Sequence, residues 1–161
     1  MGWLHRLDHL IGRITAGAQW LALPLILLLF LQWPLRDMVR CCSRQANDLG
    51  QIFFAVLVAV SVTAATRAGT HLASDALAYR YSPHTRRRLR QFGAAFAVLP
   101  WAIFIVVASK SFVAGSVLGL ELFPDTFNPG YFIIKAAIWI MAVLMIAQAV
   151  LDIARPHPDD V

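Results

Sequence analysis

Four long apolar runs separated by short polar segments decide what this chain can fold into. The runs lie at 14–35, 49–66, 91–116 and 131–151, and Lys110 and Lys135 are the only charged residues within them. A bilayer has a hydrocarbon core about 30 Å thick, so a helix rising about 1.5 Å per residue needs about 20 apolar residues to cross it. The sequence therefore predicts an all-α integral membrane protein with four transmembrane helices.

The composition supports a membrane protein made of one unit. Apolar residues make up 59% of the 161 residues, against roughly 45–50% in an average soluble domain. The net charge of +5 comes from basic residues placed between the apolar runs, not spread over a soluble face with stacking aromatics. This placement favours contact with lipid headgroups over a nucleic-acid partner. No repeat or linker divides the chain, so we expect a single membrane domain over 1–161.

Local signals predict several details of the helices. Pro24 lies inside the first run and should kink its helix, because proline lacks the N–H of a regular helical turn. The Asn47-Asp48 pair is expected to cap the second helix. Between the second and third runs, an apolar stripe through Leu72 and Tyr79 predicts a short amphipathic helix lying on the membrane plane. Ser82-Pro83 should end that helix and open the next one.

The distribution of Lys and Arg predicts which way the chain crosses the membrane. The segment 67–90 alone carries six arginines. If this segment is inside, nine basic residues lie on the inner side and five on the outer side. Loops rich in Lys and Arg stay in the cytoplasm, so both termini are expected to be cytoplasmic.

The spans contain no pattern for covalent or redox chemistry. All five histidines fall at span ends or in loops, where they cannot hold a haem between facing helices. Cys41 and Cys42 are adjacent and have no second pair, so neither a disulfide framework nor a CxxC site can form. We predict no catalytic residue, cofactor, metal site or substrate site. A carrier would also be expected to bury ionisable residues in its spans, and these spans are almost free of them.

Polar side chains at the span boundaries are the candidate functional residues. They suit hydrogen-bonded contacts with a partner subunit or with headgroups, although helix capping and hydration explain several of them equally well. For Lys110, as for Lys135, extension of the side chain towards the headgroups is the simpler explanation. Gly115 and Gly119 form a GxxxG pair that could seat another helix. The six candidates are Asp48, Arg67, His71, Asp75, Lys110 and Glu121.

Two segments resemble a known family. Residues 67–77, RAGTHLASDAL, are similar to an R-x-G-x-H-[IV]-x-V-D-x-L motif, and residues 81–89, YSPHTRRRL, are similar to an L-S-P-x-x-R-x-x-L motif. Weaker similarities lie at 47–51 and at Ser111 with Glu121. These features resemble the small membrane subunit, or Q subunit, of tripartite ATP-independent periplasmic (TRAP) transporters.

The resemblance implies a role in transport without a substrate site in this chain. It implies a large membrane subunit, M, that carries an organic acid on a sodium gradient, and a periplasmic substrate-binding protein that delivers it. The small subunit would support M in the bacterial inner membrane. The charge-poor spans agree with a static support. Two alternatives remain at this stage: a membrane anchor for an electron-transfer complex, and a free-standing small transporter.

Overall fold

The computed structural model describes residues 2–38, 43–68 and 82–154, and these are almost entirely helical. It contains four helical segments long and apolar enough to cross a membrane, which confirms the predicted class: Gly2–Gln32, Arg44–Ala68, Arg87–Ala108 and Tyr131–Ala154. The elements are α1 (Gly2–Gln19), α2 (Ala22–Met38), α3 (Ser43–Ala68), α5 (Pro83–Gly93), the π-helical turn η1 (Ala94–Val98), α6 (Leu99–Ala108), α7 (Lys110–Leu118) and α8 (Tyr131–Ala154).

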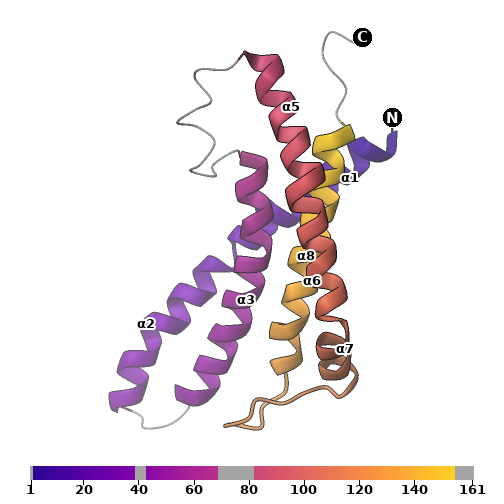
Figure 1. Cartoon of the computed structure of the whole chain (residues 1–161). Coiled ribbons are helices and arrows are strands. Elements are labelled where there is room, and N and C mark those ends of the chain that lie inside the picture. The colour runs from indigo at the N-terminus through magenta and orange to yellow at the C-terminus, as the bar shows by residue number, and fades with distance from the viewer. Residues whose placement is uncertain (1, 39–42, 69–81, 155–161) are drawn as a thin grey trace.

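The first crossing is broken where Pro24 was expected to kink it. Helix α1 ends at Gln19, and α2 begins at Ala22 after a turn at Trp20 and Leu21. Pro24 has no N–H to offer the Trp20 carbonyl, and its ring would clash with that group in a continuous helix. The Trp20 carbonyl instead accepts from the Leu23 N–H at 3.3 Å. Proline therefore separates the crossing into two helices that point in different directions (Figure 1).

Helix α3 starts before the Asn47-Asp48 pair that was expected to cap it. It begins at Ser43, so Asp48 lies in the second turn and not at the N-cap. The expected capping role of Asn47-Asp48 is therefore wrong. Helix α8 likewise continues past the apolar run to Ala154, which places Asp152 on the helix and not in a polar tail. In both cases the helix extends beyond the uncharged stretch, and the polar side chain there accepts hydrogen bonds from another element: Asp48 from the 119–130 loop and Asp152 from α5.

The third crossing consists of four short pieces. Ser82 caps α5 by accepting from the Thr85 N–H at 3.3 Å, and Pro83 follows as the first helical residue, as predicted. Further along, Pro100 cannot bond to Phe96, and the chain accommodates it with the π turn, in which the Leu99 N–H reaches the Ala94 carbonyl. A break at Ser109 then separates α6 from α7.

Helices α3 and α8 form the centre of the bundle. Both helices bury small residues, such as Ala59 on α3 and Ala142 and Ala149 on α8, and small residues let helix backbones approach closely. Helix α2 packs on α3, and α5, η1, α6 and α7 run along α8. In Figure 1, α1 crosses the bundle obliquely at the end where α1 begins and α8 ends; we call this the termini end. The opposite end carries the 119–130 loop, and we call it the loop end.

The amphipathic helix predicted between the second and third crossings falls at residues 69–81, outside the described residues. The 119–130 loop at the loop end lies within the described residues. It is closed by a bridge between Leu122 and Pro129 and by a hydrogen bond from the Phe123 N–H to the Asn128 carbonyl at 2.9 Å. Phe123 is buried beneath it, only 4% exposed. This loop is therefore folded against the bundle.

Candidate functional site

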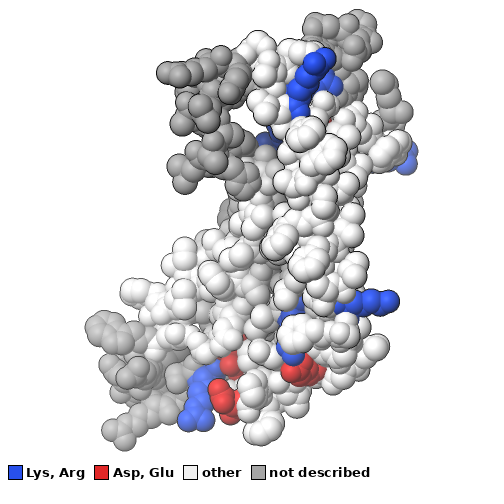
Figure 2. Space-filling view, in the orientation of Figure 1, with Lys and Arg blue, Asp and Glu red and all other residues white. Residues whose placement is uncertain are grey.

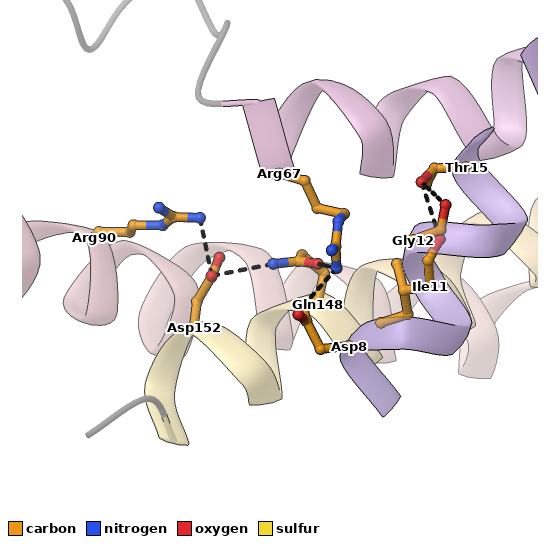
Figure 3. Close-up of polar contacts among 8 residues, drawn as sticks. All are labelled: Asp8, Ile11, Gly12, Thr15, Arg67, Arg90, Gln148 and Asp152. Carbon is orange, nitrogen blue, oxygen red and sulfur yellow. Dashed lines mark hydrogen bonds and ion pairs between the residues drawn. The ribbon is translucent and has the colours of Figure 1, made fainter. Parts of the chain in front are cut away.

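Arg67 connects three helices at the termini end. Its Nη1 atom donates to Asp8 Oδ1 on α1 at 2.8 Å and to Gln148 Oε1 on α8 at 3.3 Å (Figure 3). The Arg67 and Asp8 side chains are 23% and 35% exposed. An ion pair of this exposure is screened less than one on the surface. Arg67 thus joins the last turn of α3 to both α1 and α8.

Asp152 extends the same cluster to a fourth helix. Its Oδ1 atom accepts from Arg90 Nη2 on α5 at 3.0 Å and from Gln148 Nε2 at 3.1 Å (Figure 3). The Asp152 side chain is 3% exposed, and a buried carboxylate requires such partners to offset its lost hydration. We call these five residues, Asp8, Arg67, Arg90, Gln148 and Asp152, the termini-end network. It links α1, α3, α8 and α5 side chain by side chain.

Helix α1 packs on this network through one face. Ile11 and Thr15 are buried against the bundle, and the Thr15 hydroxyl bonds back to its own helix at the Ile11 and Gly12 carbonyls (Figure 3). A Cβ atom at Gly12 would lie 3.5 Å from Arg67 Nη2. This is an ordinary van der Waals distance, so the Arg67 guanidinium lies directly against the α1 backbone at Gly12.

Asp48 holds the loop end. Its buried carboxylate accepts from Thr126 Oγ1 at 2.5 Å and from Asn128 Nδ2 at 2.9 Å, both through Oδ2. These donors come from the 119–130 loop, about eighty positions further along the chain. Asp48 thereby fixes the loop on the first turns of α3.

Glu121 and Lys135 form a second contact at the loop end. The Lys135 Nζ atom lies 2.5 Å from Glu121 Oε2, and it also lies over the rings of Phe112 and Tyr131, at 4.2 and 5.1 Å from their centroids. The hydrogen bond from the Lys135 ammonium holds the pKa of the Glu121 carboxyl below its ordinary value. Lys135 is thus engaged inside the protein, whereas its predicted role was extension towards headgroups.

A cavity of about 910 Å³ opens at the loop end between α2, α3 and the loop. It has a mixed lining, in which Arg44 and Asp125 supply opposite charges beside the Asp48 contact. Gln32 from α2 also lines it, and the buried Nε2 atom of Gln32 has no hydrogen-bond partner among the described residues. The cavity therefore offers both charged and amide groups to a polar partner.

The structure separates the predicted site residues into three groups. Asp48, Arg67 and Glu121 make the interhelical or loop contacts described above. Lys110 is exposed at the start of α7 and enters no ion pair with the described residues. His71 and Asp75 fall outside the described residues, so their roles stay predictions.

Four residues of the termini-end network were missed by the sequence analysis. Asp8 and Asp152 lie outside the four apolar runs and were not singled out, and neither was Gln148 within its span. Arg90 was counted only among the six arginines of 67–90. A signal was available on α8, because Gln148 and Asp152 are four residues apart and therefore share one helix face. A polar pair on one face of an otherwise apolar helix indicates a contact inside the protein.

On the face drawn in Figure 2, charged side chains lie towards the two ends of the molecule, with an uncharged band between them. Basic side chains are visible at the termini end, and both acidic and basic side chains at the loop end. The described residues contain no cluster of three His, Cys, Asp or Glu that could bind a metal. This arrangement can hold helices together and present charged surfaces at both membrane faces.

Comparison with known proteins identifies the family. Residues 25–157 match the family model described as "Tripartite ATP-independent periplasmic transporters, DctQ component". No curated protein and no solved structure matches the chain. The matched range covers most of the chain and includes both segments that carry the motif resemblance. The chain therefore belongs to the DctQ component family of the tripartite ATP-independent periplasmic transporters.

Proposed function

We propose that this chain is the small scaffold subunit of a sodium-coupled TRAP transporter for an organic acid, and that it supports the large M subunit. The observation that carries the proposal is the separation of charge in the structure. The described ion pairs lie near the two ends, and none joins helices in the middle of the bilayer. A subunit that moved an anion itself would need polar groups at mid-membrane depth.

The charged contacts at each end are suited to a static supporting subunit. The termini-end network ties α1, α3, α5 and α8 together, and the Asp48 and Glu121 contacts tie the loop to α3 and α8. Contacts fixed at both ends resist sliding of one helix past another. A large M subunit that changes shape during transport would move against a small subunit that keeps its own shape.

We further propose that the termini end lies in the cytoplasm and the loop end in the periplasm of a bacterial inner membrane. The excess of arginine around the termini end supports this orientation. The periplasmic substrate-binding protein would then approach the loop end. The mixed charges of Arg44 and Asp125 beside the cavity suit a transient polar contact there.

Co-purification tests the proposal. A tagged chain, expressed with the large permease gene from its own neighbourhood and extracted in mild detergent, should retain one polytopic partner. Liposomes with both membrane subunits and the binding protein should take up the organic acid when sodium is supplied outside. Liposomes with this chain alone should show no uptake. Gradient-driven flux from the chain alone, or failure to retain any partner, would contradict the proposal.

No observation favours an electron-transfer anchor. The described histidines at 5, 9 and 84 lie on exposed surface near the termini end, away from a site between facing helices. An absorption spectrum of the purified complex is a direct check, because a haem between the helices would give a strong Soret band.

A further inference from the structure

Helix α1 has an apolar surface that the rest of the chain does not cover. One face packs on the bundle through Ile11 and Thr15. A second stripe, made of Trp3, Leu10 and Ile14, is exposed by 58%, 55% and 37%. These residues are seven and four positions apart, so they form one continuous line along the helix. A line of large apolar side chains beside a buried face needs a further apolar environment.

Basic residues lie directly beside this stripe. Arg6 is three positions after Trp3, and Arg13 is three positions after Leu10, so each guanidinium is next to an apolar neighbour on the helix surface. Both arginines are exposed, and neither enters an ion pair with the described part of the chain. His5 and His9 lie on the remaining face, where their rings meet edge to face with centroids 4.4 Å apart. Apolar, basic and polar surfaces therefore follow one another around α1.

The position of α1 along the bundle sets its depth in the bilayer. Helix α3 has 26 residues, which at 1.5 Å each span about 39 Å, longer than the hydrocarbon core of about 30 Å. Arg67, in its last turn, therefore reaches the headgroup region, and it holds Asp8 of α1 at that level. The 17 residues of α2 span only about 25 Å, so the turn at Trp20 lies inside the core. Helix α1 thus slopes from the headgroups into the acyl chains, consistent with its oblique course in Figure 1.

We propose that α1 is a binding surface for anionic phospholipid, with Trp3, Leu10 and Ile14 among the acyl chains and Arg6 and Arg13 on the phosphate groups. Charge complementarity selects this partner, because the arginines border the apolar stripe where headgroup phosphates lie. The termini-end network fixes the rotation of α1 through the Asp8–Arg67 ion pair, so the stripe keeps facing away from the bundle. The inference concerns lipid only and does not depend on the transported solute.

A label on α1 tests the headgroup preference locally. Leu10→Cys is prepared in a Cys41→Ser, Cys42→Ser background and labelled with the fluorophore bimane. The full chain is then placed in nanodiscs that contain a small fraction of brominated lipid, either phosphatidylglycerol or phosphatidylcholine. Brominated phosphatidylglycerol should quench the label more strongly, because it is enriched around α1. Arg6→Gln with Arg13→Gln should reduce that preference by about fivefold per arginine. Arg6→Lys with Arg13→Lys should keep it, as should Lys110→Gln at the other end of the bundle.

Two results would overturn the proposal. Equal quenching by both lipids with the arginines intact would show that α1 does not select anionic headgroups. Absence of quenching by either lipid, in the complex purified with its large partner, would show that protein covers the stripe. Neither result affects retention of the large subunit in co-purification, so failure here is distinguishable from failure of the scaffold function.

Discussion

Removing the Arg67 guanidinium should loosen α1 and α8 from α3. In Arg67→Met, the apolar stem is kept while both hydrogen bonds, to Asp8 at 2.8 Å and to Gln148 at 3.3 Å, are lost. A hydrogen bond to a charged group contributes about 1.5–3 kcal/mol, but the partial exposure of Arg67 and Asp8 reduces the contribution of their pair to about 1–2 kcal/mol. The Oε1 atom of buried Gln148 then lacks this partner, which costs about 1 kcal/mol more. The expected loss is about 2–3 kcal/mol in total.

The assay is unfolding by SDS in mixed micelles, followed by circular dichroism and tryptophan fluorescence. A double-mutant cycle with Asp8→Asn isolates the Asp8–Arg67 pair and should give a coupling energy of about 1 kcal/mol. The matched control is Arg13→Gln, which removes an exposed arginine from α1, the helix that carries Asp8. It should change stability by less than about 0.5 kcal/mol. A coupling energy of zero would mean that Arg67 does not hold α1 through Asp8.

Three further predictions concern the loop end. Asp48→Ala leaves the Thr126 and Asn128 donors without their acceptor and should destabilise the protein by about 1–3 kcal/mol in the same SDS titration, with faster proteolysis of the 119–130 loop. Glu121 has a lowered pKa, so its ion pair with Lys135 stabilises the fold above the ordinary carboxyl pKa and is lost as pH falls through the folded value. Glu121→Gln should therefore flatten the acid limb of a plot of melting temperature against pH, and an unchanged limb would argue against the pair. Gly130 has φ near 121°, so Gly130→Ala should cost about 1–3 kcal/mol, measured against Gly50→Ala as a control in open space within α3.

The membrane class was predictable because hydrophobicity is a local property. Each uncharged run is readable without knowing its neighbours, and α3 and α8 contain the runs at 49–66 and 131–151. The break at Trp20 was partly predictable for the same reason, because Pro24 perturbs only the turn before it. Local chemistry likewise predicted that Pro83 opens α5.

The contacts at the two ends were not predictable in this way. Asp48 satisfied every local rule for a helix cap, but its partners come from a loop about eighty residues away. Asp152 followed an apolar run and had the sequence context of a solvated tail, although Arg90 and Gln148 bury it. Such pairs depend on how each helix is rotated and tilted against the others. Short-range sequence patterns do not specify these rotations and tilts, so the partners of boundary residues became visible only in the folded bundle.

A rigid supporting subunit should keep its internal distances constant while the transporter works, and one such distance can be measured during transport. Spin labels replace Phe30 on α2 and Phe104 on α6, both exposed and on opposite flanks of the α3–α8 centre, in a Cys41→Ser, Cys42→Ser background. Pulsed electron paramagnetic resonance is then recorded on the assembled transporter without ligands, with sodium, and with sodium and organic acid. We predict one narrow distance distribution that is the same in all three conditions. A shift of several ångströms, or a second population that grows with sodium or acid, would contradict the account.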